Sequence, residues 1–173
     1  MDHTGIVMVY TGDGKGKTTA AMGLALRAAG HGHKVSIVQF MKGQQSGEID
    51  ALEKYLPMVD VYRYGTEQFV NADDPSDEDV AAAQAGLKRA MELLRGDSHV
   101  LILDEANVAI AYRLIDGKKL KEALENRPSD MTVVITGRGL SPEIEAVADL
   151  ISEVKEIRHH WRKGVPAQKG IEH

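Results

Sequence analysis

A short glycine- and lysine-rich segment near the start of the chain limits the possible folds more than any other feature. Residues 11–19 read TGDGKGKTT, and they lie between an apolar, strand-like run at 6–10 and an alanine- and leucine-rich stretch at 18–29. A strand, a glycine-rich turn and a helix beginning at Gly-Lys-Thr form the context that a phosphate-binding loop, or P-loop, requires. The segment therefore predicts an α/β domain that binds a nucleoside triphosphate at the start of its first helix.

The residue types in this segment suit the binding of phosphate and a metal ion. Gly14 and Gly16 can take backbone angles closed to other residues, which lets main-chain N–H groups approach a ligand. Lys17 supplies a point charge for phosphate oxygens, and Thr18 a hydroxyl for bound Mg²⁺ or Mn²⁺. Thr11 stands where the usual pattern begins with glycine, which predicts a variant way of holding the phosphates. The predicted nucleotide-binding residues of the loop are Gly12, Asp13, Gly14, Lys15, Gly16, Lys17, Thr18 and Thr19.

Further candidate ligand-binding residues lie at the ends of two later predicted strands. Asp104 and Glu105 follow the apolar run 100–103, and Arg138 stands between two glycines after the run 132–136. In open α/β sheets ligands sit at the carboxyl ends of strands, where one carboxylate can bind Mg²⁺ directly and the other through water. An arginine there can bind phosphate in a bidentate manner. Taken alone, a solvated strand end and a plain tight turn remain alternatives for the two segments.

Apolar runs of strand length alternate with helical stretches along the whole chain, which predicts a mostly parallel sheet with helices on both faces. The length of 173 residues suits one domain over residues 1–173. Ser76 is predicted to cap a helix, and the regions 42–51 and 64–74 are expected to be irregular. The predicted strands are 6–10, 35–41, 59–62, 100–103, 132–136 and 150–154, and further helices are predicted at 18–29, 120–124 and 142–148.

Composition excludes several classes of protein. The chain has no cysteine, which rules out disulfide scaffolds, thiolate metal sites and thiol catalysis. The net charge of −5 argues against a nucleic-acid partner, and no apolar run approaches the roughly 20 residues that a membrane span needs. We therefore expect a cytoplasmic protein. Because the guanine motif Asn-Lys-x-Asp is absent, a P-loop ATPase, a small-molecule kinase and a regulatory nucleotide-binding module are the readings that the residues leave open.

Six segments together resemble the P-loop family of ATP:cob(I)alamin, or corrinoid, adenosyltransferases. They occur in the family order and cover nearly the whole chain, and the last of them has no generic reason to accompany a P-loop. The matching segments are TGDGKGKTTAA (11–21), RAAGHGHK (27–34), VQFMKG (38–43), LDEAN (103–107), VITGRG (134–139) and AQKGIE (167–172).

The resemblance implies an unusual use of ATP. In this family the Co(I) centre of a reduced corrinoid, cob(I)alamin or a precursor, attacks the 5′ carbon of the ribose, and the whole triphosphate leaves. It implies that Lys15 and Lys17 neutralise the triphosphate, with Lys17, Thr18 and Glu105 forming the catalytic set. Mg²⁺ would lie on Thr18 and Glu105, with Asp104 as a further or water-mediated ligand.

The resemblance also implies nucleotide contacts outside the loop and two protein partners. Arg138 would hold a terminal phosphate, and Arg27 is a weaker candidate for the same task. A homodimer and a reducing flavoprotein partner are expected. Some family members place aromatic side chains on the lower face of the corrinoid, and Phe69 is the candidate here.

Overall fold

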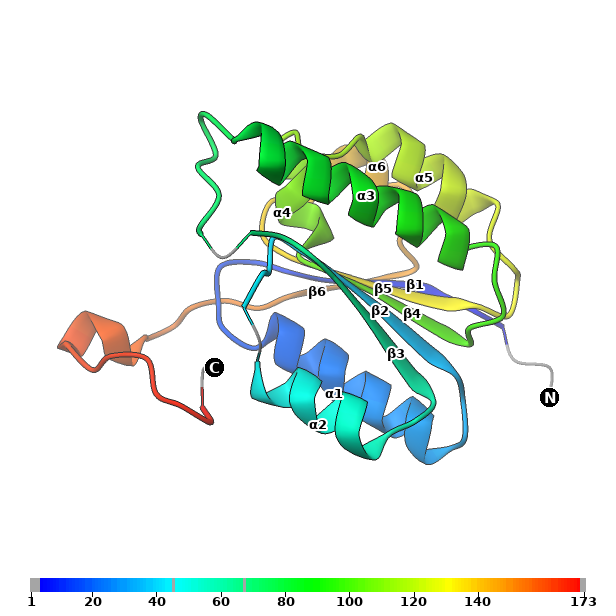
Figure 1. Cartoon of the computed structure of the whole chain (residues 1–173), viewed down its shortest axis with the longest axis horizontal. Coiled ribbons are helices and arrows are strands. Elements are labelled where there is room, and N and C mark those ends of the chain that lie inside the picture. Colours follow the sequence, from blue (N-terminus) through cyan, green and yellow to red (C-terminus); the bar gives the residue numbers. More distant parts are fainter. Residues whose placement is uncertain (1–3, 45, 67, 172–173) are drawn as a thin grey trace.

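The computed structural model describes residues 4–44, 46–66 and 68–171. Within them a sheet of six parallel strands has the order β3-β2-β4-β5-β1-β6, with helices on both faces (Figure 1). The fold class predicted from the sequence is therefore confirmed. The strands are β1 (Val7–Thr11), β2 (Val35–Phe40), β3 (Val59–Tyr64), β4 (Val100–Asp104), β5 (Thr132–Thr136) and β6 (Leu150–Glu153). The helices are α1 (Lys17–Gly30), α2 (Gly47–Tyr55), α3 (Asp77–Leu93), α4 (Ala106–Ala111), α5 (Gly117–Glu125), α6 (Pro142–Glu145) and the 3₁₀ helix η1 (His160–Lys163).

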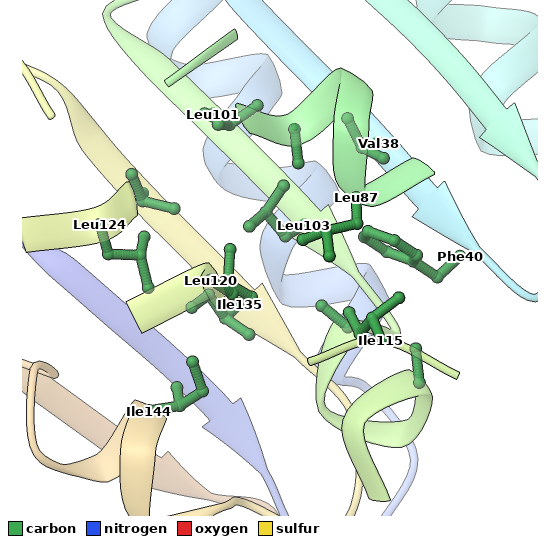
Figure 2. Close-up of a cluster of buried hydrophobic side chains, with 14 of the residues drawn as sticks. Val38, Phe40, Leu87, Leu101, Leu103, Ile115, Leu120, Leu124, Ile135 and Ile144 are labelled. Atoms are coloured by element: carbon green, nitrogen blue, oxygen red, sulfur yellow. The ribbon is translucent and has the colours of Figure 1, made fainter. Parts of the chain in front are cut away.

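The three central strands β2, β4 and β5 are buried at every residue. Because helices cover both of their faces, their sequences are nearly continuous apolar runs and show no alternation of apolar and polar residues. Helices α1 and α2 cover one face, and α3, α4, α5 and α6 cover the other (Figure 1). The larger cluster of buried side chains lies under the second group and includes Phe40, Leu87, Leu103, Leu120 and Ile135 (Figure 2).

The predicted cap of α3 is confirmed. The backbone N–H of Asp79 donates to the Ser76 hydroxyl at 3.1 Å, and the backbone N–H of Ser76 donates to the Asp79 carboxylate at 3.2 Å. This reciprocal arrangement, a capping box, satisfies two N–H groups that the helix cannot pair internally. It fixes the helix start at the end of the loop that follows β3.

The structure corrects the sequence prediction at three helices. The region 42–51, expected to be irregular, contains the start of α2 at Gly47, and α4 was not predicted because six residues are too few to show a helical period. Helix α6 is four residues long where 142–148 was expected. The chain turns after it so that the backbone N–H of Asp149 reaches the carbonyl of Val7 at 2.8 Å and β6 can begin.

Four neighbouring strands bring the candidate residues to one edge of the sheet. The order β2-β4-β5-β1 places the carboxyl ends of these strands side by side. The segment after β6 runs out from the same edge (Figure 1). Within the residues that the structure describes, no helix is both long enough and apolar enough to cross a membrane.

Candidate nucleotide-binding site

A cavity of about 900 Å³ lies at the carboxyl edge of the sheet. Its volume is within the range of roughly 300–1,000 Å³ that is usual for small-molecule sites. Most of the predicted site residues line it, together with Lys42 from the end of β2 and four residues of the segment after β6. The predicted residues on its wall are Asp13, Gly14, Lys15, Gly16, Lys17, Thr18, Thr19, Glu105 and Arg138.

The loop between β1 and α1, residues Gly12–Gly16, is called the glycine loop below. Gly12 and Gly16 have φ values of 97° and 118°, a region that side chains other than glycine rarely enter. The N–H of Gly14 donates to the carbonyl of Val154 at 2.8 Å, and a Cβ on Gly14 would lie 2.8 Å from that oxygen. The glycines are therefore required by the backbone path and by close packing against the segment after β6.

Helix α1 points its first turn at the cavity. Its N-cap residue Gly16 has no side chain to satisfy the first N–H groups, and no acidic residue lies in the first turn. These N–H groups and the positive end of the helix dipole favour an anion. The Lys17 ammonium is buried and donates to the carbonyl of Gly14 at 2.7 Å. Burial lowers the pKa of Lys17, because the charged form loses its hydration and only partly regains it from nearby carboxylates.

Asp104 is the most extensively hydrogen-bonded side chain of the site. It is fully buried at the end of β4, and four donors contact its two oxygens. Burial alone would raise the pKa of Asp104, but the Lys42 ammonium and the hydroxyls hold it below its ordinary value. Asp104 is therefore an ionised anchor whose acceptor sites are filled. The donors are Thr18 Oγ1 (2.8 Å) and Thr136 Oγ1 (2.7 Å) to Oδ1, and Gln39 Nε2 (3.0 Å) and Lys42 Nζ (2.7 Å) to Oδ2.

The Glu105 carboxyl lies in surroundings that raise its pKa, in contrast to that of Asp104. The φ of Glu105 is 61°, and its backbone N–H donates to Thr136 Oγ1 at 3.0 Å, which holds this residue in the left-handed conformation. Burial raises the pKa of the Glu105 carboxyl, and the negative charge of Asp104 raises it further, while Lys42, Lys17 and Arg138 oppose the shift. Non-glycine residues in this conformation occur often at functional sites, where the surrounding structure maintains them.

The donor set at this edge fits Mg²⁺. The Thr18 hydroxyl gives its one hydrogen to Asp104, so its lone pairs remain for a cation. Burial and the negative charge of Asp104 are the largest causes of the raised pKa of the Glu105 carboxyl, and a bound cation would relieve it. Across the same residues no cluster of three His, Cys, Asp or Glu side chains is placed to hold a metal. Mg²⁺ commonly binds through one or two protein oxygens completed by substrate phosphates and water.

The two arginines named from the sequence lie in different places. Arg138 reaches across the glycine loop, where its Nη2 donates to the carbonyl of Asp13 at 3.3 Å and its Nε lies 3.7 Å from Asp13 Oδ1. Arg27 is exposed in the last turn of α1 and does not line the cavity. A ten-residue separation from Lys17 corresponds to about 15 Å along the helix. The structure therefore brings Arg138 to the site and leaves Arg27 outside it.

Sequence reasoning missed three residues of the site: Gln39, Lys42 and Thr136. Gln39 lies near the end of β2, in register with Asp104 of β4, and Lys42 lies just after that strand. Thr136 is the last residue of β5. A signal for two of them is present in the sequence. Gln39 and Thr136 are polar residues at the carboxyl ends of otherwise apolar runs, and such residues need a buried partner.

An all-parallel sheet with a glycine loop, a lysine at the start of α1 and two adjacent carboxylates at the carboxyl end of β4 defines an α/β protein of the P-loop NTPase type. The model of the family "ATP:corrinoid adenosyltransferase BtuR/CobO/CobP" matches residues 3–173. The chain belongs to this family.

Curated relatives agree with this assignment. A corrinoid adenosyltransferase of Escherichia coli (strain K12) is 40% identical over 174 residues, which cover 99% of this chain and 87% of the relative. One from Pseudomonas aeruginosa is 36% identical, covering 99% of this chain and 85% of the relative. The corrinoid adenosyltransferase CobA of Salmonella typhimurium is 38% identical, covering 99% and 87%.

Proposed function

We propose that this protein transfers the 5′-deoxyadenosyl group of ATP to the Co(I) centre of a reduced corrinoid and releases tripolyphosphate, in the synthesis or salvage of adenosylcobalamin. The electron pair of Co(I) forms the cobalt–carbon bond, and the C5′–O bond breaks with its electron pair on the leaving triphosphate. The observation that carries the proposal is the family match over residues 3–173, together with a cavity whose wall holds Lys15, Lys17 and Arg138 beside Glu105.

The residues around the cavity suit the departure of a polyanion. Lys17 and the first turn of α1 present positive charge to the triphosphate, and Lys15 and Arg138 line the same wall. Charge fixed in advance near a leaving group lowers the barrier without reorganisation at the moment of reaction. Thr18 and Glu105 would hold Mg²⁺, which when bound neutralises triphosphate charge. Asp104 positions Thr18 through the 2.8 Å hydrogen bond between them.

The partners in this proposal follow from the family. The corrinoid is cob(I)alamin or a precursor, and a reducing flavoprotein in the cytoplasm supplies the Co(I) state. A homodimer is proposed as well, and the open edge at β6 supports it, since Leu150 and Ile151 are 38% and 43% exposed there. Light scattering on the purified protein tests for the homodimer.

The experiment that tests the proposed function follows both products. The protein is mixed with ATP, Mg²⁺ and chemically reduced cob(I)alamin, and the corrinoid spectrum is recorded while the phosphate products are separated. We expect the light-sensitive alkyl-cobalt spectrum to appear with one tripolyphosphate per corrinoid. ADP without a spectral change would show a phosphotransferase or ATPase, in which Glu105 polarises water or a hydroxyl.

Phe69 is proposed to pack on the lower face of the corrinoid. Its side chain is fully exposed in the loop after β3, so its apolar surface has no cover in the described chain. Covering a phenyl ring stabilises a complex by about 1.5–3 kcal/mol. Phe69→Ala should therefore lower kcat/KM for the Co(II) corrinoid, assayed with its reductant, by about 10- to 100-fold.

The matched control is Leu26→Ala, which removes an exposed apolar side chain from α1. This variant should keep the wild-type rate. The role of Phe69 is excluded if Phe69→Ala is as active as the wild type with both the chemically reduced corrinoid and the Co(II) form.

A further inference from the structure

Lys42 is a cation of the cavity for which the family resemblance gives no role. It follows β2, lines the cavity together with Lys15 and Lys17, and its side chain is 30% exposed. Its ammonium forms an ion pair with Asp104 Oδ2 at 2.7 Å. One side of this ammonium therefore contacts the buried carboxylate, while the side chain still reaches the cavity where the triphosphate is proposed to bind.

The backbone that carries Lys42 is held in a fixed path. Met41, just before it, has a φ of 57°, a left-handed conformation that costs free energy for a residue with a side chain. Gly65 after β3 packs so closely that a Cβ there would overlap the backbone nitrogen of Lys42. The segment after β3 therefore locks the position of the Lys42 backbone, while the long side chain keeps four rotatable bonds.

Asp104 does not depend on Lys42 alone. If the ammonium moves away, Oδ1 keeps the hydroxyls of Thr18 and Thr136, and Oδ2 keeps the amide of Gln39. A carboxylate with three remaining donors is still well satisfied. Exchange of Lys42 between this carboxylate and another anion thus leaves both oxygens of Asp104 with hydrogen-bond donors.

We propose that Lys42 is a triphosphate-binding residue that is stored on Asp104 in the ligand-free protein and moves to a phosphate oxygen when the triphosphate binds. A compact ammonium with three donors suits this exchange between anions. The inference rests on the proposed function for its ligand. It adds a third lysine, from the segment after β2, to Lys15 of the glycine loop and Lys17 of α1.

The test is a calorimetric titration of the full-length protein with sodium tripolyphosphate. A charge-assisted hydrogen bond contributes about 1.5–3 kcal/mol, so Lys42→Met should bind tripolyphosphate about 10- to 100-fold more weakly than the wild type. Lys42→Arg keeps the charge and should bind within a few fold of the wild type. Rescue by arginine distinguishes a phosphate contact from a need for lysine packing.

Lys34→Met is the matched control. Lys34 precedes β2 at the opposite edge of the sheet and pairs with Asp97 at 2.6 Å, so its loss should leave tripolyphosphate binding unchanged. If Lys42→Met does not fold, Lys42→Gln provides the same test, since its amide can still donate to Asp104 without a charge. Wild-type affinity in the uncharged variant would overturn the proposal and leave Lys42 as a partner of Asp104 alone.

The proposed function and the role of Lys42 are tested by different measurements, so the failure of one can be told from the failure of the other. If the product assay yields ADP in place of tripolyphosphate, the adenosyl transfer is wrong. A loss of tripolyphosphate affinity in Lys42→Met would still assign this lysine to the phosphate site.

Discussion

Replacing Glu105 by Gln is expected to lower the rate of adenosyl transfer by on the order of a thousandfold and to raise the stability of the ligand-free protein. The loss of activity follows because a metal ion held by this carboxylate contributes several kcal/mol of charge stabilisation in the transition state. The gain in stability follows from the raised pKa of Glu105, which burial and the charge of Asp104 cause. The glutamine amide has the same shape but no charge, so it removes both the cost of burying a charge and the repulsion from Asp104.

The stability effect has a defined pH dependence. In the unfolded chain Glu105 ionises near its ordinary value of 4.5, whereas in the folded protein it keeps its proton to a higher pH. Its ionisation therefore destabilises the folded state at neutral pH, and this penalty disappears as the pH falls through the raised pKa. Urea unfolding at neutral pH and at pH 4.5 should show the advantage of Glu105→Gln only at neutral pH.

Two results would contradict the role of Glu105. Activity within tenfold of the wild type at saturating Mg²⁺ would remove it from the metal site. An unfolding midpoint below that of the wild type would show that the carboxylate is satisfied by contacts other than a metal. Glu48→Gln is a suitable control, because this residue is exposed on the wall of the same cavity.

Replacing the adjacent Asp104 by Ala is expected to have the opposite effect on stability. The substitution leaves the donors from Thr18, Gln39, Lys42 and Thr136 without their acceptor. Leaving a buried donor without a partner costs about 1–3 kcal/mol, so the loss of several lowers the melting midpoint of a domain of this size by roughly 10 °C. Transfer activity should fall as well, since Thr18 loses the acceptor that orients it.

Here too the pH dependence is fixed by the direction of the pKa shift. The pKa of Asp104 lies below its ordinary value of 3.8, so its contribution is present above that pH and is lost as the pH falls through the folded value. Thermal unfolding at neutral pH measures the full difference. Asp97→Ala, which removes the exposed partner of Lys34, should leave the midpoint unchanged. A similar midpoint for Asp104→Ala and the wild type would show that this carboxylate does not anchor the site.

The sequence predicted the sheet well because its strands are short, β-branched runs separated by helical stretches. The bounds of β5 agree residue for residue with the predicted 132–136, and the remaining strands agree within two residues. It predicted the short helices poorly. Helix α4 directly follows Glu105 and has too few residues for a period, and the start of α2 lies among Gly, Gln and Ser residues that favour turns.

Residues with a local motif could be placed in the site from the sequence, and residues defined by strand order could not. Lys17, Thr18 and Glu105 belong to recognisable segments, and the structure brings all three to the cavity. Lys42 and Gln39 reach Asp104 only because β2 lies beside β4. Strand order depends on packing between distant segments, so the sequence pattern did not indicate it.

The position of β1 inside the sheet bears on how the chain is made. Strand β1 lies between β5 and β6, and the N–H of Val7 donates to the carboxylate of Asp149, 142 positions later. The glycine loop itself rests on Val154 through Gly14. The nucleotide site is thus built from segments that lie far apart in the sequence, because the supports of β1 and of the glycine loop come from the residues just before and just after β6. A growing chain therefore cannot complete this site until the segment after β6 has been synthesised, which delays any competition for nucleotide by chains that still lack it.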